Sequence, residues 1–124
     1  MKSLFNIVFY RDEKGHEPAR EFIQELERFP KLNRQRLRKI NLYLAELEQF
    51  GLALGKPQID SIKTQENLYE LRPGGDRIFF CCIMKTTFVL LHGFVKKTQK
   101  TPPNEIERAC RERDAVLRKE YPND

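Results

Sequence analysis

The Pro-Gly-Gly-Asp turn at residues 73–76 constrains the fold most, because it separates two strand-like segments, residues 68–72 and 77–84. Proline and glycine in this order favour a tight turn, so the two segments are predicted to form a β-hairpin. A four-residue loop makes Arg72 and Arg77 direct cross-strand partners whose side chains share one face. The sequence therefore predicts a sheet with two opposed arginines on one of its faces.

Hydrophobic periodicity assigns the other elements. Residues 4–10 are rich in β-branched and aromatic side chains, which is typical of a strand. Apolar residues at helical spacing predict helices over residues 17–29 and 33–50, and the short connection between them favours an antiparallel αα-hairpin. The remaining predicted elements are strands at 58–62 and 87–95 and a helix at 103–120. This order predicts an α+β fold with a mixed or antiparallel sheet.

Composition excludes several classes of protein. A chain of 124 residues has room for one domain, so we expect a single domain over residues 1–124. The longest apolar run, residues 78–84, is far shorter than the ~20 residues of a membrane span. The first five residues lack the apolar core of a signal peptide, and we expect a cytoplasmic protein with no membrane partner.

The cysteine and charge counts give weaker indications. Cys81, Cys82 and Cys110 have no zinc-binding spacing, so we expect reduced thiols and no metal site. The 23 Lys and Arg residues outnumber the 18 Asp and Glu residues and give a net charge of +5. A mildly basic chain is weak support for an anionic partner.

The second hairpin of the predicted sheet decides which side chains share the face of the arginines. A two-residue turn at Lys85-Thr86 would pair Met84 with Thr87 and leave one face almost wholly apolar, as a seat for the helices. The opposite face, here called the charged face, would hold Glu70, Arg72, Arg77, Phe79, Phe88, Leu90, His92, Phe94 and Lys96. Basic and aromatic side chains together suit RNA, because phosphates attract cations and unstacked bases stack on rings such as Phe79 and Phe94.

Cations extend the charged face beyond the last strand. Lys96, Lys97 and Lys100 follow that strand and could join Arg72 and Arg77, although a solvated exit loop and two solvated arginines are the plainer alternative. If both arginines reach water, replacing Arg77 by alanine should relieve a like-charge pair and leave the fold intact. His92 is either a catalytic residue among these cations or a packed, hydrogen-bonded strand histidine.

A second basic block lies on the helical hairpin. Six Lys and Arg residues and no acidic residue occur between positions 28 and 39, and Arg34 and Arg38 are among them. The block is either a phosphate-docking surface, whose affinity would fall with salt, or an ordinary solvated helix face.

Three segments carry a resemblance to a known family: Leu-Tyr-Glu-Leu-Arg at 68–72, Arg-Ile-Phe-Phe at 77–80 and Leu-Leu-His-Gly-Phe-Val-Lys-Lys-Thr-Gln-Lys-Thr-Pro at 90–102. With them, the chain resembles the phage-derived branch of the RelE/HigB-type toxins of bacterial toxin–antitoxin systems, from its first strand to about Arg113. The resemblance implies an α+β domain with a curved sheet and an endoribonuclease that cuts mRNA in the ribosomal A site. It also implies a cognate antitoxin with a helix-turn-helix domain as partner.

The working positions of that family fall on Arg72, Arg77 and the lysines at 96, 97 and 100. One departure is that Thr101-Pro102-Pro103 follows the last lysine, where some relatives place a tyrosine, and Tyr121 lies much farther along. The general base therefore stays open.

RNA can be cut without metal or cofactor when its own 2′-hydroxyl attacks the adjacent phosphate and arginines stabilise the charge that develops. The sequence predicts such an endoribonuclease. A non-catalytic module that binds RNA or the ribosome through the same face is the alternative, and a protein that only holds a partner chain is a third.

Overall fold

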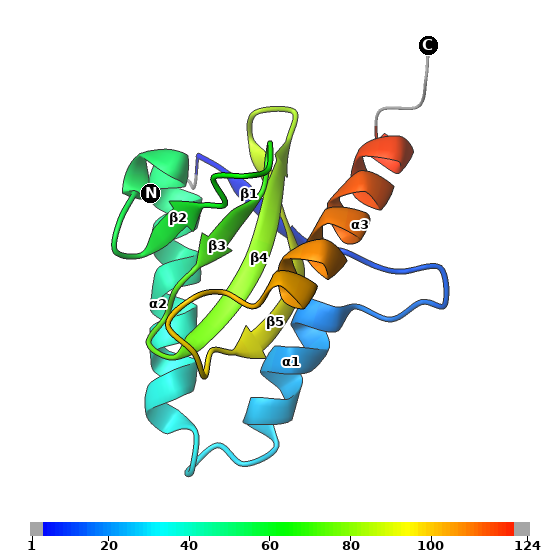
Figure 1. Ribbon diagram of the computed structural model, residues 1–124. Helices are drawn as coiled ribbons and strands as arrows, with labels where there is room; N and C mark the ends of the chain where they lie inside the picture. The colour runs from blue at the N-terminus through cyan, green and yellow to red at the C-terminus, as the bar shows by residue number, and fades with distance from the viewer. Residues whose placement is uncertain (1–3, 121–124) are drawn as a thin grey trace.

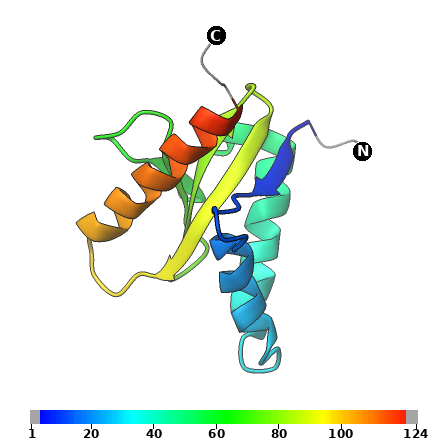
Figure 2. The same cartoon turned by 90° about the vertical axis from the view of Figure 1, so that its right-hand side faces the viewer.

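The computed structural model describes residues 4–120, so Tyr121 and the first three residues lie outside it. Helices cover both faces of a sheet: α1 (Pro18–Glu27) and α2 (Arg34–Phe50) form an antiparallel hairpin on one face, and α3 (Pro103–Glu120) crosses the other (Figures 1 and 2). The strands are β1 (Asn6–Phe9), β2 (Ile59–Ser61), β3 (Tyr69–Leu71), β4 (Asp76–Ile83) and β5 (Thr87–Val95). This architecture confirms the predicted α+β class and the αα-hairpin.

The sheet is mixed, as predicted. Its strand order is β1-β5-β4-β3-β2, with β1 parallel to β5 and the other neighbours antiparallel. A short 3₁₀ turn, Gly51–Leu54, follows α2, where Gly51 adopts a φ of 59°. Among residues 4–120 there is no helix both long and apolar enough to cross a bilayer.

Two apolar clusters hold the layers together. The apolar residues at helical spacing on α2 pack on the sheet, with Ile40 and Leu47 fully buried. On the other face, α3 buries Ala109 and Val116 against the sheet, and its partly buried Ile106, Cys110 and Leu117 pack around them. The expectation that the charged face is open is therefore wrong over part of its area, because α3 covers Phe79 and His92 there.

The turn between β4 and β5 is one residue longer than predicted. Ile83 pairs with Thr87, so Met84, Lys85 and Thr86 form the loop, and the first two have φ values of 52° and 62°. The shift by one residue reverses the alternation along the start of β5. Phe88 and Leu90 therefore pack toward α1 and α2, and Val89 and Leu91 toward α3, opposite to the prediction.

A β-bulge restores the predicted pairing farther along. Phe80 pairs with Leu90 and Ile78 with Gly93, so two β5 residues oppose one β4 residue. Both of these β5 residues, Leu91 and His92, contact the α3 side. Beyond the bulge Gly93 faces α1, where the Phe22 ring lies so close that an added Cβ would be 2.6 Å from its Cδ2 atom.

Candidate functional site

The hairpin of β3 and β4 carries Arg72 and Arg77 in the predicted register. Tyr69 pairs with Phe80 and Leu71 with Ile78, so the two arginines fall opposite each other at the mouth of the hairpin. A carboxylate separates their charges. Glu70 Oε1 lies 3.7 Å from Arg72 Nε and 3.8 Å from Arg77 Nε.

A second carboxylate extends this arrangement to β2. Asp60 is the direct cross-strand partner of Glu70, and its Oδ2 lies 3.7 Å from Arg72 Nη1. Acidic and basic side chains thus alternate over three neighbouring strands, which offsets the repulsion expected between like charges directly opposed. Arg72 remains 30% exposed in its side chain and is the arginine that an anion in solvent can reach.

Arg77 lies deeper than predicted, only 9% exposed. Its Nη1 donates to the carbonyls of Gly74 at 2.6 Å and Asp76 at 2.7 Å, while its Nε has no hydrogen-bond partner within the described chain. Burial lowers the pKa of this guanidinium, and the nearby Glu70 carboxylate partly opposes that change. Arg77 therefore orders the turn and contributes a charge behind Arg72.

Arg36 of α2 fixes the same turn from the helical side. Its Nε and Nη2 donate to the two carboxylate oxygens of Asp76 at 3.1 and 2.7 Å. Asp76 is buried, and its hydrogen bond with Arg36 raises the pKa of the Arg36 guanidinium. Arg36, a member of the second basic block, therefore links α2 to the β3–β4 hairpin.

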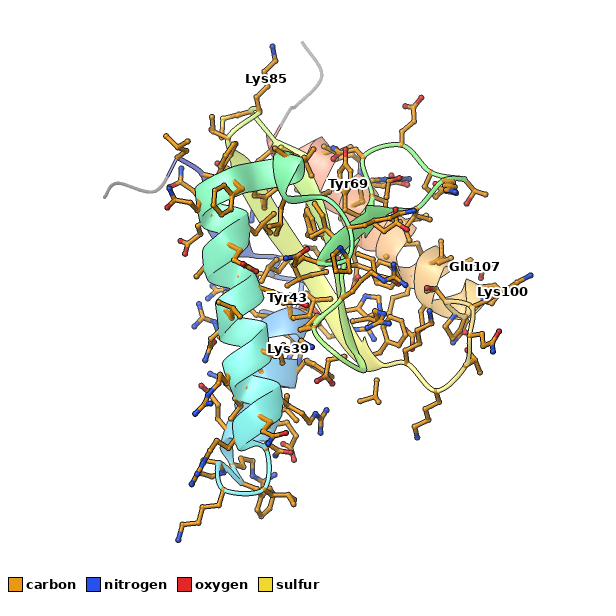
Figure 3. All side chains as sticks on the ribbon, turned by 90° about the vertical axis from the view of Figure 1, so that its left-hand side faces the viewer. Lys39, Tyr43, Tyr69, Lys85, Lys100 and Glu107 are labelled. Carbon is orange, nitrogen blue, oxygen red and sulfur yellow. The ribbon has the colours of Figure 1, made fainter. Side chains whose placement is uncertain are left out.

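The lysine-bearing loop after β5 is tied to the hairpin at both ends. The amide of Lys96 donates to the Gly75 carbonyl at 2.9 Å, and the Thr101 hydroxyl donates to Glu70 Oε2 at 2.8 Å. Between these ties Lys97 and Lys100 are exposed, and Figure 3 shows Lys100 projecting near the start of α3. The two ends of the loop therefore lie against the hairpin that carries Arg72, and the gathering of its lysine side chains around Arg72 stays a prediction.

His92 and Phe79 lie beneath α3 and not on an open surface. His92 is 1% exposed, with Nδ1 2.6 Å from Glu112 Oε1 and Nε2 3.0 Å from Glu105 Oε1. Phe79 is fully buried and stacks on the half-buried Phe94 at a centroid distance of 5.6 Å. The expectation that Phe79 stacks on bases is therefore wrong, and His92 joins β5 to α3 as the packed histidine of the plainer alternative.

Arg34 and Arg38 are exposed on α2, as both a phosphate-docking surface and an ordinary solvated helix face require. They line a shallow groove of about 340 Å³ with Pro30, Lys31 and Leu37. Farther along α2, Lys39 and Tyr43 point toward the β3–β4 hairpin in Figure 3, with Lys39 Nζ 5.8 Å from the Tyr43 ring centroid. The basic block and the arginine hairpin are therefore neighbours in space.

Two members of the site were missed from the sequence. Asp60 lies in a three-residue strand whose partner no local pattern specifies, and Thr101 belongs to a loop. A separate cleft of about 420 Å³, lined by Val8, Tyr10, Val116, Lys119 and neighbours, contains none of the predicted site residues. No group of three His, Cys, Asp or Glu side chains within residues 4–120 could hold a metal ion.

Comparison with known proteins adds the family. No curated protein matches the sequence. The family described as phage derived protein Gp49-like (DUF891) matches residues 24–114, a stretch that includes the α2 basic block, the arginine hairpin and the lysine loop. The chain therefore belongs to the Gp49-like family of phage-derived proteins, which is associated with the toxins of toxin–antitoxin systems.

Proposed function

We propose that this protein is a RelE/HigB-type toxin, an endoribonuclease that cleaves mRNA on the ribosome without a metal ion and thereby inhibits translation. The observation that carries the proposal is the half-buried Arg72 beside a tethered loop with Lys96, Lys97 and Lys100. An arginine on a strand, with a basic loop anchored next to it, suits a phosphate whose charge rises in the transition state. A cognate antitoxin with a helix-turn-helix domain would neutralise the protein.

The mechanism follows from these positions. Arg72 binds the scissile phosphate, with Arg77 behind it adding positive charge at 9% exposure. The 2′-hydroxyl of the adjacent ribose gives its proton to a base as its oxygen forms a bond to phosphorus, and the bond from phosphorus to the 5′-oxygen breaks. A loop lysine supplies the proton that the leaving 5′-oxygen takes up. The products are a 2′,3′-cyclic phosphate and a free 5′-hydroxyl.

The alternative is a module that binds RNA or the ribosome without cutting it. Its support is the burial of His92 and Arg77, which leaves Arg72, the loop lysines, Arg34 and Arg38 as the predicted site cations that solvent reaches. Such a surface gives salt-dependent affinity and needs no reactive group.

One experiment separates these functions. The protein is incubated with ribosome-bound mRNA and with a matched mRNA in which the scissile nucleotide lacks its 2′-hydroxyl. We expect cleavage of the first and none of the second, with both bound equally, because the phosphate contacts are unchanged. On ribosome-free RNA, any cleavage should persist in excess chelator. The binding module predicts no products from either RNA, and undiminished cutting of the deoxy substrate contradicts the mechanism.

A further inference from the structure

Three carboxylates surround the paired arginines, and two of them are already occupied. Glu70 is 4% exposed and accepts the Thr101 hydroxyl at 2.8 Å, with both arginines beside its other oxygen. Asp76 is 2% exposed and has both oxygens bound by Arg36. Neither can take a proton from a substrate without giving up the bonds that shape the hairpin.

Asp60 is in a different position. Its side chain is 27% exposed, and its Oδ1 accepts the Ser61 amide at 2.9 Å. Its Oδ2 lies 3.7 Å from Arg72 Nη1 and 3.7 Å from Lys56 Nζ. These are ion-pair distances too long for hydrogen bonds, so Oδ2 keeps lone pairs that a substrate hydroxyl can approach.

Asp60 lies directly beside Arg72, which is where a base must lie if Arg72 holds the scissile phosphate. The role of base requires that the ribose next to a phosphate held by the Arg72 guanidinium lie on the β2 side of that arginine. A general base must come within hydrogen-bond reach of the proton that it removes. Asp60 is the exposed carboxylate on that side, and Lys56, Arg72 and the deeper Arg77 offset its repulsion of the phosphate.

We propose that Asp60 is the general base that accepts the proton of the attacking 2′-hydroxyl, an inference that rests on the proposed function. The proton moves from the 2′-oxygen to Asp60 Oδ2 as the bond from the 2′-oxygen to phosphorus forms. The bond from phosphorus to the 5′-oxygen breaks, and that oxygen takes its proton from a loop lysine. Exchange with water then returns the carboxyl and the amine to their starting states.

The first test replaces the carboxylate by its neutral isostere. Asp60→Asn should lower the cleavage rate by roughly 10²-fold or more at saturating RNA, as for loss of a general base. Its affinity for the 2′-deoxy RNA should stay equal to or above that of the wild type, because one negative charge has gone. The matched control is Asp114→Asn on α3, where an exposed carboxylate pairs with Arg113 at 3.0 Å, and it should cleave normally.

The second test distinguishes a base from a residue that merely positions Arg72. In Asp60→Ala, added acetate should restore more activity than the less basic formate at equal concentration, because rescue follows basicity when a proton is transferred. The wild-type rate should also rise about tenfold per pH unit on the acid side of its profile, a limb that Asp60→Asn should lack.

The outcomes separate the inference from the function on which it rests. Equal rescue by the two anions, or full activity of Asp60→Asn in a preparation whose wild type cleaves RNA, overturns the role of Asp60 and leaves the endoribonuclease standing. A wild type that cleaves neither free nor ribosome-bound RNA overturns both. Folding of each variant is checked by circular dichroism, and if Asp60→Asn fails to fold, the rescue measured within folded Asp60→Ala is decisive.

Discussion

Arg72 and Arg77 stand opposite each other on one hairpin, yet their surroundings give them different tasks. Arg77 bonds two turn carbonyls at 2.6 and 2.7 Å and faces the buried Glu70, so its removal leaves polar groups unpaired. Arg77→Ala should therefore lower the free energy of unfolding by about 1–3 kcal/mol. This reverses the expectation from the sequence that Arg77→Ala would leave the fold intact.

Arg72 is the matched comparison at the same hairpin. Its side chain is 30% exposed and its ion pairs are 3.7 Å long, so Arg72→Ala should change the free energy of unfolding by less than about 0.5 kcal/mol. The same variant should lower the cleavage rate by roughly 10²-fold, as for loss of one transition-state donor. Urea denaturation and a cleavage assay on both variants measure the contrast. Equal stability losses at the two positions would contradict the assignment of Arg77 to the fold and Arg72 to the site.

The elements themselves were predicted closely from the sequence, since helical spacing and turn residues are local signals. The register of β5 was predicted wrongly. In the loop at residues 84–86, two non-glycine residues have positive φ values, and no turn motif in the sequence indicates this conformation. The longer turn shifts the pairing of β5 by one residue, and the bulge at Leu91 and His92 shifts it back. His92 therefore lies on the predicted face, although the register before the bulge was predicted wrongly. That face is covered by α3, and the position of α3 on the sheet depends on contacts between residues far apart in the sequence. Such contacts leave no local sequence pattern from which they could be predicted.

The tie between β5 and α3 can be tested at His92. Its imidazole lies between Glu105 and Glu112, and Glu112 is only 7% exposed, so His92→Ala leaves a buried carboxylate with Arg108 as its remaining partner. The free energy of unfolding should fall by roughly 2 kcal/mol, with faster amide exchange in α3. Glu112→Ala in the same chain should recover part of that loss, because the unpaired charge is then gone. Losses that simply add in the double variant would contradict the coupling.

Over the whole molecule, positive charge gathers at two neighbouring places, the α2 block and the arginine hairpin with its lysine loop. The sequence identified both groups of cations but could not tell which of them are neutralised. Arg36 pairs with Asp76, and Arg72 and Arg77 share Glu70, so much of the apparent excess is internal. The cations left for a partner are those at exposed positions, and this distribution, more than the net charge of +5, governs binding.

The exposed α2 cations should contribute affinity without chemistry. The double variant Arg34→Ala, Arg38→Ala should weaken binding of 2′-deoxy RNA. It should also flatten the plot of log affinity against log salt by up to about 0.7 for each single-strand phosphate that the variant no longer neutralises. Its cleavage rate at saturating RNA should equal that of the wild type, because neither side chain joins the ties that hold Arg72 and the lysine loop.

The matched control is Arg118→Ala, Lys119→Ala, which removes the same charge from exposed positions in the last turn of α3, far from the loop that joins α1 and α2 (Figure 1). If general attraction by a basic protein explained RNA binding, both double variants would weaken it equally and leave similar salt slopes. If the surface on α2 docks the RNA backbone, only the first variant loses slope. If the Arg34→Ala, Arg38→Ala variant has the same salt slope as the wild type, Arg34 and Arg38 belong to an ordinary solvated helix face. The RNA would then be bound by the arginine hairpin and its lysine loop without α2.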